Sequence, residues 1–254
     1  GDVYKRQGLY DPAFEHDACG IGFVAHIKGI KSHQNVGDAL TILENMEHRG
    51  ASGSEINTGD GAGIMIQIPH ELFFDELLHK GLHLPNAGEY GVGFIFFPTE
   101  KGVAEECKEI FERAAEKLNI EIIGYRQVPV NREPIGPTAL SVEPIMEQVF
   151  VKKPEHVKDD EDFERKLFIL RNYASHTINN TIKKSAVDFY MTSLSQNVIV
   201  YKGQLTSHQV REYFPDLSDK RVVSAFGLVH SRFATNTFPS WKLAQPFRYI
   251  AHNG

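Results

Sequence analysis

The stretch CGIGFVA, residues 19–25, places a thiol at the head of a short apolar run. Ile, Phe and Val favour a buried strand, and the glycines allow another molecule to approach the backbone closely. A thiol in this setting is a candidate nucleophile. The alternative is that Cys19 is a small buried apolar residue, as most cysteines are.

Residues 1–18 are polar, lack periodicity and are predicted to form a leader or propeptide ahead of a domain over residues 19–254. Removal of this leader would give Cys19 a free α-amino group beside its thiol. The pKa of an α-amino group is roughly 7.7–8.0, against about 10.4 for a lysine amine. An appreciable fraction of the amine is therefore neutral near neutral pH and can accept the thiol proton.

The composition, 41% hydrophobic and 24% charged over 254 residues, is ordinary for a globular chain. The formal net charge of -6 argues against a nucleic-acid partner, because phosphate binding needs a basic surface. No apolar stretch is long enough to span a membrane, and the N-terminus lacks a signal core. Two cysteines cannot form a disulfide framework, so we expect a reducing, cytoplasmic location.

Hydrophobic periodicity predicts an α+β layered domain, because several strands occur with few helices between them. Cys107 falls on the apolar face of one predicted helix, and four acids at 159–162 suit the N-terminus of another. The segment 129–144 is rich in turns. Helices are predicted over 35–46, 102–118, 159–178 and 207–213, and strands over 20–27, 64–68, 91–97, 121–128, 189–194, 198–201, 222–230 and 247–251, with 189–201 as a hairpin.

Four short stretches become informative together, and the set resembles the class II glutamine amidotransferases of the N-terminal nucleophile hydrolase superfamily. They are DACGIG (17–22), EHRGASG (47–53), HSRFATNT (230–237) and AHNG (251–254). Within that family the resemblance is closest to the glutaminase domains of glutamate synthases. It covers residues 8–254 and is carried by YDP (10–12), HRGA (48–51), GDGAG (59–63) and the motif RFATNTFPSW (232–241).

The resemblance implies a four-layer αββα sandwich and a glutamine-hydrolysing activity. Cys19 would attack the glutamine amide, form a thioester and release ammonia. The side-chain amide of Asn253 and the backbone N–H of Gly254 would hold the oxyanion. Removal of one such donor costs about 2.7–4 kcal/mol of transition-state stabilisation. Alone, Asn253-Gly254 would favour an ordinary turn.

Similarity to the family assigns Arg232 to the α-carboxylate of L-glutamine, which a guanidinium can bind with two parallel hydrogen bonds. Thr235 resembles the neighbouring hydroxyl ligand, and Arg49 resembles a second site arginine that orients the backbone at Cys19. Alone, either arginine would fit a surface salt bridge. The carboxylate that the family uses for the substrate ammonium group is expected beyond Gly254.

The resemblance also implies partners and cofactors outside this fragment. Ammonia would pass to 2-oxoglutarate in the synthase domains of the same chain, with FMN and an iron–sulfur cluster there and a small reductase subunit as a further partner. No cofactor or metal is expected in residues 1–254. The rival functions are a glutaminase domain that serves another ammonia acceptor, and an unprocessed noncatalytic scaffold that binds glutamine.

Other candidate sites receive less support from the residues. The loop Gly59–Gly63 lacks the lysine and hydroxyl residue of a phosphate-binding loop, so we interpret it as tight turns near the site. His79 and His83 lack a third metal ligand. His230 or His252 could instead orient the thiol of Cys19, as in a papain-like pair that would act with the leader attached.

Two departures from a working family member make us expect an inactive or very weak fragment. While residues 1–18 remain, the nitrogen of Cys19 is an amide and cannot act as a base. The sequence also stops inside the oxyanion motif, where a terminal carboxylate on Gly254 would oppose the developing negative charge. Ala234 stands where the family pattern has a serine.

Overall fold

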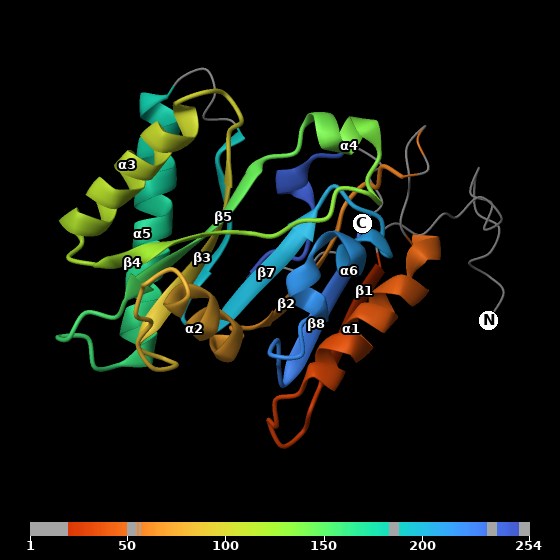
Figure 1. Ribbon diagram of the computed structural model, residues 1–254, viewed down its shortest axis with the longest axis horizontal. Helices are drawn as coiled ribbons and strands as arrows, with labels where there is room; N and C mark the ends of the chain where they lie inside the picture. Colours follow the sequence, from red (N-terminus) through yellow and green to blue (C-terminus); the bar gives the residue numbers. More distant parts are fainter. Residues whose placement is uncertain (1–19, 50–54, 56, 183–187, 233–237, 249–254) are drawn as a thin grey trace, which may run out of the picture.

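The computed structural model describes residues 20–49, 55, 57–182, 188–232 and 238–248. Over these residues the chain is α+β, with two antiparallel four-stranded sheets and six α-helices, which confirms the α+β part of the prediction. Figure 1 shows the two sheets beside each other, with helices lying over them. None of the described helices is long and apolar enough to cross a membrane.

The first sheet, called here the β1 sheet, has the order β1-β8-β2-β7. β1 is an edge strand, and its Ile21 and Phe23 are 44% and 62% exposed. The prediction of a buried strand is therefore wrong: the glycine face of β1 packs on helix α1, while the face with these two side chains is open among the described residues. The elements are β1 (Gly20–Ala25), β8 (Phe226–Ser231), β2 (Ala62–Gln67), β7 (Val198–Gly203) and α1 (His33–Asn45).

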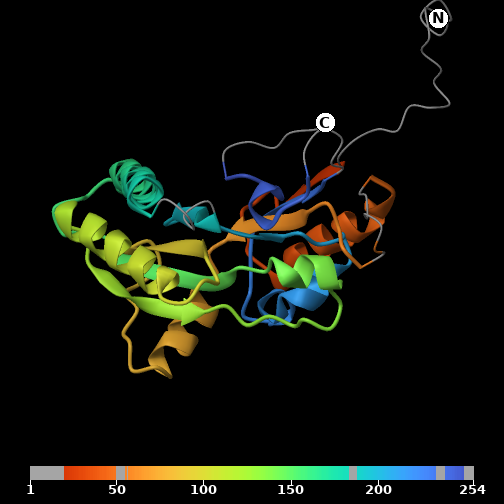
Figure 2. The same ribbon diagram turned by 90° about the horizontal axis from the view of Figure 1, so that it is seen from above.

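The second sheet, the β3 sheet, has the order β4-β5-β3-β6. Helices α3 and α5 cover one of its faces, and Figure 2 shows α2 on the opposite side. Each face has its own apolar cluster, because alternate residues of a strand point to opposite sides. The elements are β4 (Ile122–Gln127), β5 (Ile145–Lys152), β3 (Tyr90–Phe97), β6 (Tyr190–Ser195), α2 (His70–Leu78), α3 (Val103–Lys117) and α5 (Asp160–Thr181).

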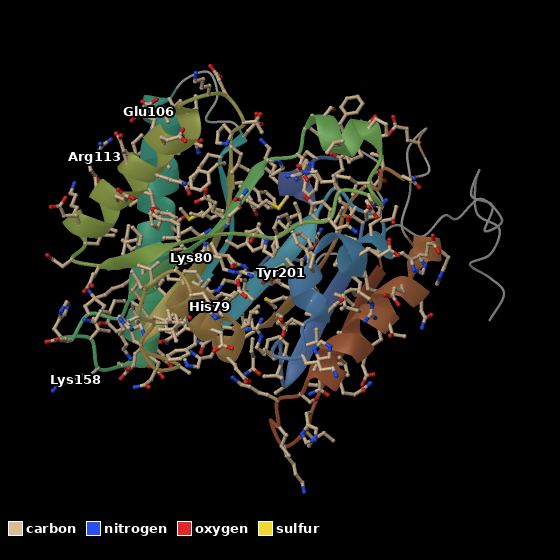
Figure 3. All side chains as sticks on the ribbon, viewed as in Figure 1. His79, Lys80, Glu106, Arg113, Lys158 and Tyr201 are labelled. Carbon is tan, nitrogen blue, oxygen red and sulfur yellow. The ribbon has the colours of Figure 1, made fainter. Side chains whose placement is uncertain are left out.

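Helices α3 and α5 form as the periodicity predicts. Cys107 is fully buried on α3, as expected of a core position. The carboxylate of Asp159 caps α5 by accepting a 2.8 Å hydrogen bond from the backbone N–H of Glu161, and the acidic first turn complements the helix dipole. Figure 3 shows Glu106 and Arg113 on the outer side of α3.

The predicted hairpin over 189–201 is wrong, because β6 pairs with β3 whereas β7 pairs with β2. The chain therefore crosses from one sheet to the other at this turn. Side chains take the place of a backbone ladder: the Thr192 hydroxyl donates to the carbonyl of Val200 at 2.9 Å, and the N–H of Val200 donates to the hydroxyl of Ser193 at 3.2 Å.

A buried polar network joins the two sheets beside Tyr201, which is labelled in Figure 3. The Tyr201 ring packs edge-on against Phe94 of β3 at 5.2 Å, and its hydroxyl donates to Asp216 at 2.9 Å. Arg126 donates twice to the same carboxylate, at 2.8 and 2.9 Å, and once to Gln148. A buried ion pair is strongly destabilising to break, so the Arg126–Asp216 pair and its bond to Tyr201 link β4 of one sheet to β7 of the other.

Short helical segments complete the described chain. Part of the predicted turn-rich connection 129–144 forms a helix, α4, which the sequence analysis did not predict. The predicted strand at 247–251 is not a strand at residues 247 and 248, and the remainder lies outside the described residues. These segments are η2 (Glu47–Arg49), α4 (Pro137–Ser141), α6 (Gln209–Tyr213), η4 (Pro215–Ser218) and η5 (Trp241–Leu243).

Candidate active site

The β1 sheet brings two of the predicted site stretches together at one end of its strands. Gly20, which directly follows Cys19, opens β1 and pairs with Ser231, the last residue of β8. Arg232 comes directly after Ser231. The position next to the predicted nucleophile and the predicted carboxylate-binding arginine therefore lie at the same end of two neighbouring strands.

Several predicted site residues lie outside the described residues. These are Cys19, Thr235, Asn253 and Gly254, together with Ala234 and His252. Arg49 closes the short helix η2, and the structure describes its backbone only. The leader, residues 1–18, also falls outside the description.

Arg232 is buried, with 9% of its surface exposed, and the glycine-rich loop positions it. Its backbone N–H donates to the carbonyl of Gly61 at 2.8 Å, and its guanidinium Nη1 donates to the carbonyl of Asp60 at 3.3 Å. A guanidinium presents its five donors in a fixed planar fork, which matches the geometry of a carboxylate. This placement is consistent with a carboxylate-binding role.

The glycines of this loop are required by close backbone contacts. A Cβ on Gly59 would lie 2.2 Å from the carbonyl carbon of Leu205, and Gly61 has a φ of +136°, which disfavours any L side chain. A Cβ on Gly63 would lie 2.5 Å from the Cβ of Lys202 and 2.7 Å from the carbonyl oxygen of Gln245. The loop therefore serves tight packing under the site, which supports the tight-turn interpretation.

We expect Gly63→Ala to lower the free energy of unfolding by about 1–3 kcal/mol, because the added methyl group must displace backbone on both sides. Urea denaturation of the two proteins measures this difference. Gly37→Ala is the matched control: its Cβ meets nothing within 4 Å, and alanine favours the helix by up to about 1 kcal/mol. Equal losses in both variants would show that the close contacts at Gly63 are unimportant.

Trp241, from the motif 232–241, anchors the segment that follows. Its indole is 4% exposed, covers Gly203 at the end of β7, and donates from Nε1 to the carbonyl of Ala139 at 3.1 Å. It packs edge-on against Phe96 at 6.3 Å between ring centroids. The motif thus fixes residues 241–248 against the same end of the β1 sheet as Arg232.

Sequence reasoning missed Lys202, which lies under this segment with no exposed surface. The only available signal was its place in the strand alternation Val198-Val200-Lys202, and a lysine at such a position is normally exposed. Its side chain contacts residues 242 and 244.

The other histidine candidates differ in their placement. His230 is fully buried on β8, one residue before Ser231. His79 lies at the end of α2, as Figure 3 shows. Among the described residues no group of three or more His, Cys, Asp or Glu side chains could hold a metal ion. The papain-like alternative stays open, because it depends on Cys19.

Comparison with known proteins assigns the chain to a class. The sequence pattern of the class-II glutamine amidotransferases matches residues 19–254, beginning at Cys19. The chain belongs to this family.

The similar proteins are glutamate synthases. The chain is 47% identical to "Glutamate synthase [NADH]" of Schizosaccharomyces pombe, over 100% of this chain and 12% of the relative. It is 45% identical to "Glutamate synthase [NADPH] large chain" of Bacillus subtilis, over 98% of this chain and 16% of the relative. For "Ferredoxin-dependent glutamate synthase 2, chloroplastic" of Arabidopsis thaliana the identity is 40%, over 97% and 15%. The chain thus spans less than a fifth of the length of these relatives.

Proposed function

We propose that this chain is the glutaminase part of a glutamate synthase and hydrolyses L-glutamine to glutamate and ammonia. One observation carries the proposal: the β1 sheet places the residue next to Cys19 and the buried Arg232 at the same end of two neighbouring strands. Membership of the class-II glutamine amidotransferases supports glutamine as the substrate.

In the proposed mechanism, Cys19 becomes the N-terminal residue after removal of residues 1–18. Its α-amino group accepts the thiol proton, and the thiolate attacks the carboxamide carbon of glutamine. The carbonyl oxygen becomes an oxyanion, which the Asn253 amide and the Gly254 N–H stabilise. When the oxyanion collapses, the C–N bond breaks and the amine nitrogen takes a proton and leaves as ammonia. Water then cleaves the thioester and releases glutamate.

Substrate recognition is assigned to residues near this edge. Arg232 would bind the α-carboxylate of glutamine, and Thr235 would add a hydroxyl contact beside it. Arg49 would orient the backbone around Cys19. Support for Arg232 is its burial and its two contacts with the glycine-rich loop, one from its backbone N–H and one from its guanidinium.

We also propose the four-layer αββα architecture of N-terminal nucleophile hydrolases for the complete domain. The packing of α3 and α5 on the β3 sheet and of α1 on the β1 sheet supports it. Contacts between the sheets, such as Phe94 with Tyr201, support a sandwich arrangement.

In the full-length protein, ammonia would react with 2-oxoglutarate in the synthase domains of the same polypeptide. FMN and an iron–sulfur cluster would belong to those domains, since the two cysteines of this chain cannot supply the thiolates of a cluster. A small reductase subunit is a further proposed partner. The cytoplasm is the proposed location, because Cys107 is a free thiol.

The test is an assay of the full-length protein with Cys19 at its N-terminus. We expect glutamine to yield glutamate and ammonia, and 2-oxoglutarate with a reductant to consume the ammonia. Hydrolysis without transfer to 2-oxoglutarate would favour a glutaminase that serves another acceptor. Glutamine binding without hydrolysis would favour the scaffold and contradict the proposal.

A further inference from the structure

We propose that Lys202 is a positioning residue of the glutaminase site: its buried Nζ group fixes the segment 241–247 against the glycine-rich loop that holds Arg232. The inference rests on the proposed glutaminase function and adds a residue that no motif identifies. Lys202 is on β7, at the opposite edge of the sheet from β1, which Cys19 precedes. It therefore acts through the segment that it holds.

The side chain of Lys202 is fully buried and its Nζ is saturated with acceptors. It donates to the carbonyl of Ala244 at 2.7 Å, to the carbonyl of Lys242 at 3.1 Å and to the hydroxyl of Tyr190 at 3.3 Å. The rings of Tyr190 and Phe247 lie 4.6 and 4.3 Å from the nitrogen. One side-chain nitrogen therefore contacts three positions of the segment and one strand of the other sheet.

This arrangement is costly for a purely structural role. In the described part of the chain no carboxylate forms an ion pair with Lys202, and an ammonium group loses its hydration on burial. Burial, followed by the charges of Arg171 and Arg232, lowers the pKa of Lys202 well below its usual value. A methionine would fill the same space without this penalty but could not donate to the carbonyls of Lys242 and Ala244, so we assign the Nζ group to holding them.

The segment that Lys202 holds lies directly on the site loop. Ala244 packs so closely on Gly61 that a Cβ added to this glycine would clash with the Cβ of Ala244. The carbonyl of Gln245 approaches Gly63 equally closely. Gly61 accepts the backbone N–H of Arg232. The contacts of Lys202 thus extend through the segment to the backbone that carries the substrate-binding arginine.

The two ends of the segment are fixed by other contacts. Trp241 is buried against Gly203, and Arg248 contacts Glu164 and the hydroxyl of Ser195. Lys202 supplies an attachment between these ends. Asn253 follows soon after Arg248 in the sequence. The position of the segment therefore determines where the stretch with the proposed oxyanion donors begins.

These contacts predict a specific kinetic defect. Loss of the Nζ group removes its hydrogen bonds to the carbonyls of Lys242 and Ala244 and lets the segment shift. Arg232 keeps its own contacts with Gly61 and Asp60, so binding of the glutamine carboxylate should change little. Small displacements of transition-state donors lower kcat steeply.

The experiment uses the full-length protein with Cys19 at its N-terminus and the Lys202→Met variant. We expect kcat for glutamine hydrolysis to fall about 100-fold, while KM changes by less than about threefold. Amide hydrogen exchange in residues 241–247 should become faster. Tyr190→Phe, which removes only the hydroxyl acceptor at 3.3 Å and keeps the ring, should lower kcat in the same direction by about threefold.

Lys108→Met is the matched control, because Lys108 is a partly buried lysine that pairs with Glu147 on the β3 sheet. This control should leave kcat, KM and exchange in 241–247 unchanged. An unchanged kcat in Lys202→Met, or an equal loss in the control, would overturn the inference while the glutaminase function stood. If amide exchange becomes faster in Lys202→Met but the unsubstituted protein hydrolyses no glutamine, Lys202 does hold the segment. The proposed function would then be contradicted, and the positioning role with it.

Discussion

Cys19→Ser in the full-length protein is expected to lower kcat for glutamine hydrolysis about 10,000-fold. The serine hydroxyl is far less acidic than a thiol, so the α-amino group cannot generate a comparable nucleophile at neutral pH. Glutamine should still bind, because Arg232 does not depend on the thiol for its position. Stopped assays of ammonia release and calorimetric titration with glutamine measure the two effects.

Cys107→Ser is the control that the chain itself offers. Cys107 is fully buried on α3, and burial, with the charge of Glu106, raises the pKa of its thiol to about 11. It is therefore protonated and unreactive at neutral pH. We expect the variant to lose some stability and to retain normal turnover. Loss of turnover in Cys107→Ser, together with activity in Cys19→Ser, would reverse the assignment of the nucleophile.

Arg232→Met is expected to lower kcat/KM for glutamine about 100-fold, mostly through a higher KM. The reason is the loss of a paired, charge-assisted contact with the α-carboxylate, worth about 1.5–3 kcal/mol. Initial rates over a range of glutamine concentrations separate KM from kcat. Glutamine analogues that lack the α-carboxylate should lose their disadvantage in the variant.

Arg221→Met serves as the comparison for this prediction. Arg221 precedes the opposite end of β8 and pairs with Asp75 and Asp219, so its removal also breaks ion pairs. It should leave KM within about twofold of the wild-type value. A KM for Arg232→Met that matches this control would exclude Arg232 as the carboxylate ligand.

The helices of this chain were predictable because local signals dominate there. The 3.6-residue period and the acidic run at 159–162 predict α5, and the structure places Asp159 as its cap. The burial of Cys107 followed from the same period on α3. Strand β5 and helix α2 were not predicted. In β5, the polar Gln148 interrupts the apolar pattern and is buried through its bonds with Arg126 and Tyr201.

Long-range pairing was the part that sequence could not provide. The Ser195-Gln196-Asn197 turn indicates a hairpin, but β6 and β7 find partners in different sheets. Likewise β1 has the composition of a buried strand and occupies an edge. Both outcomes depend on which strands meet across the sequence, and local propensity carries little information on this.

Motifs in the sequence predicted the candidate site, but they did not predict the residues and contacts that position it. Resemblance identified Arg232, and its nearness to Gly20 became visible only through the β1–β8 register. The glycine-rich loop was predicted to form tight turns near the site, and the structure adds that Gly59 and Gly63 are closely packed against other backbone. Lys202 could not be found, because lysines at alternate strand positions usually face water.

The central claim is that a free α-amino group on Cys19 activates its thiol, and one comparison tests it most directly. Full-length protein that begins at Cys19 is compared with protein in which residues 1–18 remain attached, each verified by N-terminal sequencing. We expect the protein with its leader to show less than about 1% of the glutaminase rate, because its Cys19 nitrogen is an amide without basicity. Equal rates in the two proteins would contradict the claim and favour a side-chain base such as His230.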